Sequence, residues 1–412
     1  MTQRCLRNFT AIVLLLCVSA FLNPVLANTY NVTSTTDFPI SGAGISVANA
    51  TGIITGGAGN GQITLRSAIA AANNVAGPHT INLPGGTFNL TIAGPAEGFG
   101  GDITIGDLDV LMSGITIQGA GMNSTIINQT TGVERVFDVN VNYVSGTAFN
   151  FTIDGVTVSG GRSSSANGFS EGGGIFCGSN NANGLTTVTN CKFLNNQSSG
   201  AGLGGGAVSS DGGNLTVTGC IFGGLNPTDF NQAGTSGGAI SWTAVALPQT
   251  FNCTNSTFTN NVANSAAAGG GGIDAAAINL GSGTVTVSGC TFTGNHANNQ
   301  GGGGVNNESV TLNITKCTFL NNTAKFGGAV KASGGLGTTV NFCRLVGNTF
   351  VAGGNGNGFN AAGASVTLNG DNNWWGVNTG PAGADLSTAG GATITLTRWL
   401  QLKTTAAASP IC

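Results

Sequence analysis

Apolar and polar residues alternate in short runs that recur along most of the chain. Each run has two apolar positions, a polar or glycine pair and two more apolar positions, as in FTIDGVTV at 151–158 and LTVTGCIF at 215–222. An alternation with a period of two predicts β-strands, and a pair such as DG or TG between them predicts a bend. The sequence therefore predicts pairs of short strands that each bury one face.

Eight copies of this unit align on the residue that opens the second strand. That residue is, in chain order, Ile115, Val156, Cys191, Cys220, Ser256, Cys290, Cys317 and Cys343. Two positions later stand Ile117, Val158, Phe193, Phe222, Phe258, Phe292, Phe319 and Leu345. Three positions earlier stand Met112, Ile153, Val188, Val217, Cys253, Val287, Ile314 and Val340. The copies follow one another every 26 to 41 residues, which is the period of a solenoid rather than of a globular domain.

Between the copies the chain has a glycine-rich signal of the type GGGI or GGAV, at 172–175, 205–208, 237–240, 270–273, 302–305 and 327–330. Gly accepts positive φ and leaves room for an adjacent coil. Asparagines at the ends of FLNN, FTNN and FTGN are expected to stack and to bond the corner backbone. The sequence predicts an all-β protein, a single-stranded right-handed parallel β-helix, with about nine coils stacked over roughly 40 Å.

Composition narrows the classes of function. The chain has 12 basic and 15 acidic residues, so it has no electrostatic footprint for nucleic acid or anionic lipid. Residues 1–27 are predicted to be a secretory signal peptide, because Arg4 and Arg7 precede the short apolar run AIVLLLCVSAFL and small residues end at Ala27. No transmembrane segment is predicted after it. The protein is expected to be exported, to the extracellular space, the bacterial cell surface or the outer membrane.

Eight cysteines follow the signal peptide. Most occupy positions that Val, Ile or Ser fill in other copies, so they are predicted to be small buried apolar side chains with free thiols. Disulfides stay open as an alternative in an oxidising compartment. A metal site is not predicted, because the chain lacks a CxxC pair and has only His79 and His296. The repeat pattern assigns no place to Cys177 or Cys412.

Residues 60–139 resemble the CSLREA domain of bacterial surface β-helix proteins. The resemblance rests on NGQITLRSAIAAANN at 60–74 and on GDLDVLMSGITIQGAG at 106–121. Leu65, Arg66 and Ala68 match the Leu, Arg and final Ala of the motif that names the domain, whereas Ile63, Thr64 and Ser67 replace its Cys, Ser and Glu. The resemblance implies a short capping helix, and Leu65, Ile69 and Ala72 would form its apolar face.

Two further stretches resemble known families. The GGA(I/V) and FxxN pairs are similar to repeats of the chlamydial polymorphic outer-membrane proteins, which are adhesin passenger domains. NNWWGVNTGP at 372–381 resembles a block that closes the β-helix of many bacterial exported proteins, in which Trp374 and Trp375 would cover the last coil. We expect a cap and first coils at 28–110, β-helix repeats at 111–371 and a C-terminal cap at 372–412. These families usually continue into further domains, so a shortened or divergent member is expected.

Candidate catalytic groups are few. The outward positions before the bend are Ser113, Asp154, Thr189, Thr218, Thr254, Ser288, Thr315 and Asn341. The outward positions after the aligned residue are Thr116, Thr157, Lys192, Ile221, Thr257, Thr291, Thr318 and Arg344. Neither set supplies the paired carboxylates of a glycosidase or the calcium-binding acids of a lyase. Both are predicted to be solvated strand faces.

The remaining charged groups leave alternatives open. Asp102, Asp107 and Asp109 form either a calcium site or, as we favour, a polar turn in the cap. Asp274, Glu308 and Lys331 on successive coils predict a surface ion network more than a catalytic group. His296 is predicted to be a solvated loop histidine. The sequence therefore predicts no catalytic residue, no cofactor and no bound metal.

The favoured hypothesis is a secreted or surface β-helix that is non-catalytic and binds through its long side face. Its partner would be an extracellular glycan or a protein of the host or cell surface. The first alternative is a polysaccharide lyase or glycoside hydrolase of the pectin-lyase-like fold, with a site built by the long loops 159–172 or 222–237. The second is a structural component of the envelope, which no feature of the sequence separates from the first hypothesis.

Overall fold

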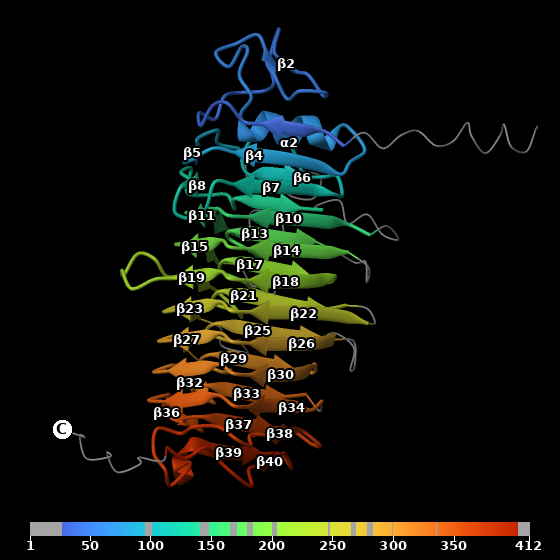
Figure 1. The fold of residues 1–412 in the computed structure, drawn as a ribbon. Coiled ribbons are helices and arrows are strands. Elements are labelled where there is room, and N and C mark those ends of the chain that lie inside the picture. The colour runs from blue at the N-terminus through green and yellow to red at the C-terminus, as the bar shows by residue number, and fades with distance from the viewer. Residues whose placement is uncertain are drawn as a thin grey trace, which may run out of the picture.

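The protein is a right-handed parallel β-helix, seen in a computed structural model (Figure 1). The structure describes residues 27–94, 101–140, 148–164, 171–178, 184–199, 204–245, 248–264, 269–277, 283–298, 300–334 and 336–402. The predicted signal peptide, apart from Ala27, and Cys412 lie outside the described residues. The predicted fold class is confirmed.

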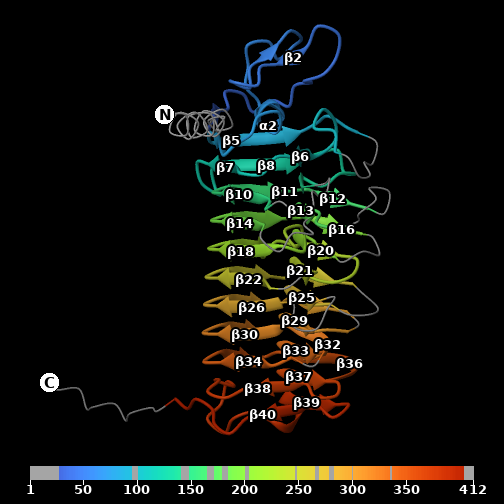
Figure 2. The same cartoon turned by 90° about the vertical axis from the view of Figure 1, so that its right-hand side faces the viewer.

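Each full coil has four strands, and the strands of successive coils stack in register into four parallel sheets (Figure 2). Among the described residues these sheets have twelve, nine, seven and ten strands, and the chain visits them in that order within a coil. The twelve-stranded sheet consists of β1 (Thr29–Asn31), β4 (His79–Leu83), β7 (Ile115–Gly119), β10 (Asn150–Asp154), β14 (Leu185–Thr189), β18 (Asn214–Thr218), β22 (Gln249–Thr254), β26 (Gly283–Ser288), β30 (Thr311–Thr315), β34 (Thr338–Asn341), β38 (Thr367–Asn369) and β40 (Thr393–Thr395).

The next two sheets follow the predicted bend. The nine-stranded sheet consists of β5 (Gly86–Leu90), β8 (Thr125–Gln129), β11 (Thr157–Ser159), β15 (Lys192–Leu194), β19 (Ile221–Gly223), β23 (Thr257–Thr259), β27 (Thr291–Thr293), β31 (Thr318–Leu320) and β35 (Arg344–Val346). The seven-stranded sheet consists of β12 (Arg162–Ser163), β16 (Gln197–Ser198), β20 (Gln232–Ala233), β24 (Val262–Ala263), β28 (His296–Ala297), β32 (Thr323–Phe326) and β36 (Thr349–Asn355).

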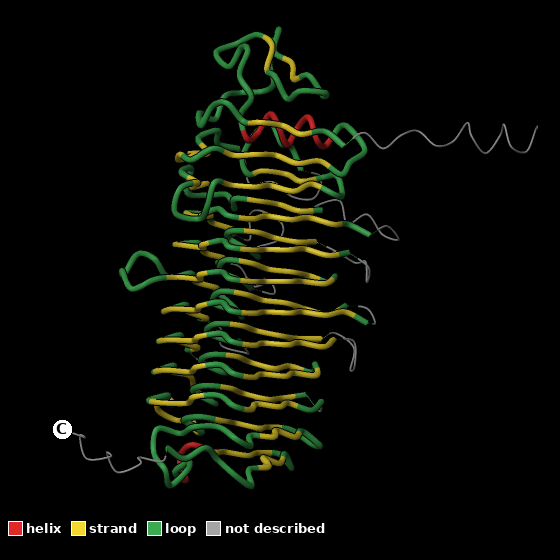
Figure 3. Tube along the Cα trace, viewed as in Figure 1, coloured by secondary structure: helices red, strands yellow, loops and turns green. Residues whose placement is uncertain are grey.

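The fourth sheet follows the glycine-rich signal. It consists of β6 (Leu108–Val110), β9 (Phe137–Val139), β13 (Ile175–Gly178), β17 (Val208–Asp211), β21 (Ile240–Ala244), β25 (Ile273–Ala277), β29 (Val305–Glu308), β33 (Val330–Ser333), β37 (Phe359–Ala362) and β39 (Leu386–Ala389). Loops connect the strands at the corners of the coil (Figure 3). A small antiparallel pair, β2 (Ser46–Val47) and β3 (Ile54–Thr55), and a 3-10 turn at Gly383–Asp385 lie outside these sheets.

The predicted register is confirmed from the second copy onward. Ile153 pairs with Val188, and Val158 pairs with Phe193, as the alignment requires. The phenylalanines of successive coils stack nearly parallel, with 4.8 Å between the ring centroids of Phe222 and Phe258. One continuous core results, with like side chains above like.

The first copy is out of register. The alignment matches Ile115 to Val156, but in the structure Ile115 pairs with Phe151. It also matches Ile117 to Val158, but the residue that pairs with Val158 is Ile127. The cause is a longer bend, 120–124, between β7 and β8, where later copies have about two residues. Because the same apolar alternation occurs on both sides of this bend, the pattern alone could not choose between them.

The aligned cysteines are buried, with free thiols, as predicted. They are also polar links between coils, which the prediction of a small apolar residue missed. The Cys317 thiol donates to the carbonyl of Thr315 (3.3 Å), and its sulfur accepts the backbone N–H of Cys290 (3.4 Å). The hydroxyl of Ser256 likewise donates to the carbonyl of Thr254 and accepts the backbone N–H of Cys220. A small donor–acceptor side chain is therefore what this corner requires.

The stacked asparagines are confirmed. The Asn261 Nδ2 donates to the Asn295 Oδ1 of the next coil (3.0 Å) and to the carbonyl of Phe222 in the preceding coil (3.0 Å). The same pattern repeats from Asn196 to Asn348. A buried amide with every polar atom bonded holds its corner without a desolvation penalty.

Glycine at the other corner is required by space and conformation. Gly205 has a φ of 76°, and a Cβ there would lie 2.3 Å from the carbonyl oxygen of Val208. A Cβ on Gly206 would lie 2.3 Å from the carbonyl oxygen of Gly238 in the next coil. The glycine segment thus lies directly against the strand that follows it.

The N-terminal cap contains the predicted helix, α2 (Leu65–Asn73). Thr64 and Ser67 cap it reciprocally, since each side chain accepts the backbone N–H of the other. Arg66 is buried and pairs with Asp37 (2.8 Å) while donating to backbone carbonyls of 103–107. The helix is not the end of the rod, because the segment with β2 and β3 lies beyond it (Figure 1).

At the C-terminal end, Trp375 packs edge-on against Phe359 with 5.0 Å between ring centroids. Trp374 is half-buried, and its carbonyl accepts the backbone N–H of Leu345, so its backbone continues the hydrogen bonding of the nine-stranded sheet. Of the two tryptophans, Trp375 therefore covers core side chains as expected. Two more strands, β39 and β40, extend their sheets past this block.

Candidate functional site

The outer surface of the twelve-stranded sheet has two unbroken columns of small polar side chains, which we call the threonine face. The first column contains Thr29, Thr80, Thr116, Thr152, Thr187, Thr216, Asn252, Thr286, Asn313, Thr339, Asn369 and Thr395. The second contains Asn31, Asn82, Gln118, Asp154, Thr189, Thr218, Thr254, Ser288, Thr315 and Asn341. Every member is half-buried or exposed, and core residues alternate with them along each strand.

Backbone geometry sets the spacing of this face. Adjacent strands of a sheet lie ~4.8 Å apart, and residues two apart on a strand are separated by roughly 6.6 Å. Side chains in the second column also bond across coils: Thr218 Oγ1 lies 3.0 Å from Thr254 Oγ1, and Thr189 Oγ1 donates to Asp154 Oδ1 (2.7 Å). The result is a two-dimensional array of hydroxyl, amide and methyl groups with a fixed repeat.

The threonine face is nearly uncharged. Asp154 is the single ionisable residue in its two columns. The nine-stranded sheet has the same strand spacing but an uneven outer surface, where Lys192, Ile221 and Arg344 stand in one column with threonines. Uniformity is thus a property of one face and not of the fold.

The structure corrects two members of the predicted outward columns. Gln118 takes the place assigned to Ser113, and Ile126 takes the place assigned to Thr116. Thr116 belongs instead to the first column of the threonine face. Both errors come from the displaced first copy.

The densest group of charges lies on the outer side of the ten-stranded sheet near its N-terminal end. Arg135 donates to Asp138 Oδ2 (2.6 Å), and its Nε lies 3.9 Å from Asp107 Oδ2. Burial alone would lower the pKa of Arg135, but Asp138, Asp107, Glu134 and Glu171 together raise it. Arg135 therefore stays charged and pairs with Asp138 and Asp107, although burial still raises the pKa of Asp138. The side chains of the five charged residues are almost fully buried, which suits a structural cluster and leaves no access for a polymer.

The three aspartates of the cap do not converge. Asp102 accepts hydrogen bonds from Thr104 (2.6 Å to its hydroxyl), whereas Asp107 and Asp109 are buried and lie toward the Arg135 cluster. In the part of the chain that the structure describes, no three or more His, Cys, Asp or Glu residues are placed to hold a metal ion. The geometry favours the polar turn over a calcium site.

Asp274, Glu308 and Lys331 were expected to form a surface network, and the structure contradicts this for two of them. Asp274 and Lys331 are buried, and Asn306 lies between the acids, donating to Asp274 Oδ1 (2.7 Å) and Glu308 Oε1 (2.9 Å). Burial, with a contribution from Glu308, raises the pKa of Asp274 to about 7. Burial lowers the pKa of Lys331.

The two histidines have separate structural surroundings. His79 is buried, accepts the backbone N–H of Asn28 at Nδ1 (3.1 Å) and lies 2.8 Å from the carbonyl of Val75 through Nε2. His296, expected in a loop, is a half-buried residue of β28 whose Nε2 contacts Asn298. Neither lies in a nucleophile–base–acid set.

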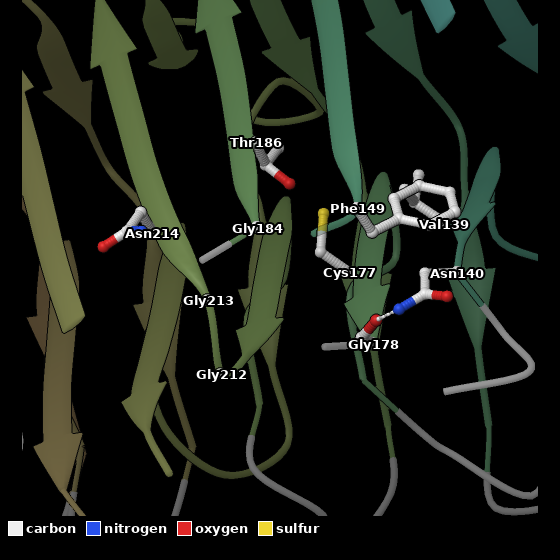
Figure 4. A pocket seen from close by; sticks show the side chains of 10 residues that line it. All are labelled: Val139, Asn140, Phe149, Cys177, Gly178, Gly184, Thr186, Gly212, Gly213 and Asn214. Carbon is white, nitrogen blue, oxygen red and sulfur yellow. Dashed lines mark hydrogen bonds between the residues drawn. The ribbon is translucent and has the colours of Figure 1, made fainter. Parts of the chain in front are cut away.

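Cys177, which the pattern could not place, lies in β13 in register with Val139 and Ser210. It lines a small hollow beside Phe149 and Thr186 (Figure 4). The open space there is about 10 Å³, room for about one water molecule. Burial raises the pKa of Cys177 to about 12, so the thiol is not activated for chemistry.

The long loops proposed to build an enzyme site supply few acids. Loop 222–237 is described in full, and its acid, Asp229, accepts a hydrogen bond from Asn226 (2.8 Å). Part of loop 159–172 lies outside the described residues. Within the described residues, no helix is both long and apolar enough to span a bilayer.

No protein-family model matches the chain, and no curated protein matches it. Two solved structures are similar in shape. The A-module of mannuronan C-5 epimerase AlgE4 from Azotobacter vinelandii has 17% identity and a TM-score of 0.32, over 91% of this chain and 100% of that one. The A-module of AlgE6 from the same organism has 16% identity and a TM-score of 0.29, over 80% and 94%.

Proposed function

We propose that the protein is an exported, non-catalytic binding protein that contacts its ligand through the threonine face. One observation carries the proposal: polar side chains with one ionisable member, Asp154, continue along the outer side of the sheet, the first column through all twelve strands and the second through ten. A uniform face that spans the rod suits an extended and uncharged surface, such as a neutral glycan on a cell, better than a small soluble molecule. The CSLREA resemblance and the predicted signal peptide add to this proposal.

The enzyme alternative has weaker support. It requires carboxylates from separate coils that converge in an accessible place. The described acids that do gather, around Arg135, are buried, and two of them pair with Arg135. A structural role in the envelope is compatible with the same rod but gives no reason for one face to be uniform while the others are not.

The test is retention of the purified protein on insoluble neutral polysaccharides and on whole bacterial or host cells. The double variant Thr216→Lys/Thr218→Lys puts two charges on the threonine face and should lower retention at least about tenfold. The matched control is Thr257→Lys/Thr259→Lys, which makes the same change in a TxT segment of the nine-stranded sheet. Equal retention of all three proteins, or turnover of a polysaccharide, would contradict the proposal.

A further inference from the structure

The spacing of the threonine face defines what kind of ligand it fits. Its two columns repeat with the strand spacing along the rod and with the two-residue step across it. Figures 1 and 2 show the strands of this sheet stacked one above another along the whole rod. The side chains thus form a grid with a short, regular repeat, and an extended ligand with its own short repeat is the natural complement.

The side chains are suited to hold water in fixed positions. Threonine is stiff at χ1, so its hydroxyl and methyl groups keep their places without a further loss of entropy on binding. Hydrogen bonds such as Thr218 to Thr254 fix hydroxyls of the second column relative to one another. Water that bridges such fixed groups forms hydrogen bonds nearly as good as direct ones. A layer of water held by these groups would take the period of the protein.

Charge complementarity separates the possible ligands. The face has Asp154 as its single ionisable residue, so it does not match an ionic polymer or a charged membrane. Neither column contains an aromatic residue, and no member of either column lines one of the described hollows. A sugar chain is normally held in a concave site that includes aromatic side chains. An uncharged lattice of hydrogen-bonding groups remains, and ice is such a lattice, with oxygen spacings of the same size as the grid.

We infer that the threonine face binds ice, through the layer of water that its hydroxyl and methyl groups hold in register. This inference rests on the proposed function, because it names the ligand of the same face. The face acts as a whole, since each coil adds a few weak contacts and the rigid rod presents all of them at once.

The experiment measures how much protein enters ice that grows slowly from a buffered solution, relative to the liquid that remains. The wild-type protein should be enriched in the ice and should inhibit recrystallisation of small crystals. Thr216→Lys/Thr218→Lys should reduce the enrichment at least about tenfold. The control Thr257→Lys/Thr259→Lys should keep it. Circular dichroism of each variant confirms that the β-helix is folded.

The possible results separate the inference from the proposed function. Exclusion of the wild-type protein from ice, combined with retention on a neutral polysaccharide that the Thr216→Lys/Thr218→Lys variant loses, overturns ice binding and leaves the binding face in place. Exclusion from ice without retention on any solid overturns both. Loss of enrichment in both double variants contradicts the placement of the site on this face.

Discussion

The outer surfaces of the twelve-stranded and ten-stranded sheets differ sharply although one chain builds both with the same strand spacing. The outward column of the ten-stranded sheet contains Asp109, Asp138, Phe176, Ser209, Ser241, Asp274, Asn306, Lys331, Asn360 and Ser387. All of these except Ser387 are buried, and identical neighbours occur twice in the column, as the pair Asp109 and Asp138 and the pair Ser209 and Ser241. The threonine face is accessible and uniform.

The glycine-rich segment explains the difference. In the six coils that have this signal, from 172–175 to 327–330, it folds back against the strand that follows, and a Cβ on Gly205 would lie 2.9 Å from the Cα of Ser209. The outward side chains that this segment covers are therefore enclosed, and each needs its own polar or packing partner. Side chains of the threonine face meet solvent, where threonine is generally favoured on a strand, so its frequency alone does not indicate a function. What distinguishes this face is that hydrogen-bonding side chains continue along the sheet with a single acid, Asp154.

The largest effect is expected from a substitution on the enclosed outer side of the ten-stranded sheet. Arg135→Met removes the cation between Asp138 and Asp107 and leaves buried carboxylates without their counter-charge. The free energy of unfolding should fall by about 3–5 kcal/mol. Urea unfolding followed by circular dichroism measures it. Lys192→Met, on the outer side of the nine-stranded sheet, is the control and should change stability by less than about 0.5 kcal/mol. Similar losses in both variants would show that the cluster has no special role.

The repeat pattern predicted the parts of the fold that depend on position within a coil. The columns from Val158 to Leu345, the stacked asparagines and the capping helix follow from period, spacing and resemblance. It failed at Ile115, because strand alternation looks alike on both sides of a longer bend. The pattern also predicted most of the second column of the threonine face, as a solvated strand surface without a ligand.

What the sequence could not predict is what covers each face. Asp274 and Lys331 looked exposed, since they are charged and follow glycines, yet the segment before each strand encloses them. Arg66 was matched to a motif without a role, and its ion pair with Asp37 joins residues 29 positions apart in a cap that has no repeat. A contact in the repeat can be inferred because the same residues recur in other coils. A contact in the cap occurs once, so the sequence offers no other copy with which to compare it.

The next effect concerns pH. Asp274 has a pKa raised to about 7 when folded, whereas an unfolded Asp has about 3.9. Between these values the folded state alone holds the proton, so the free energy of unfolding should fall as the pH rises from about 4 to 7, by about 3 kcal/mol. Asp274→Asn keeps the hydrogen-bonding shape without the titration, and its stability should vary less across this range. Thermal unfolding of both proteins at intervals of pH measures the difference. A variant with the same pH profile as the wild type would assign the effect to Glu308 or Lys331.

The smallest expected effect tests the accessible face itself. Thr216→Val removes one hydroxyl from the threonine face while keeping the β-branched shape, so the free energy of unfolding should change by less than about 0.5 kcal/mol. Ser241→Val makes a comparable change in the enclosed column, where Ser241 is buried, and should cost about 1–2 kcal/mol through overpacking and lost polar contacts. The two variants unfolded side by side in urea give the contrast directly. If Thr216→Val were the more destabilising, the threonine face would be maintained for stability, and its uniformity would no longer indicate a ligand.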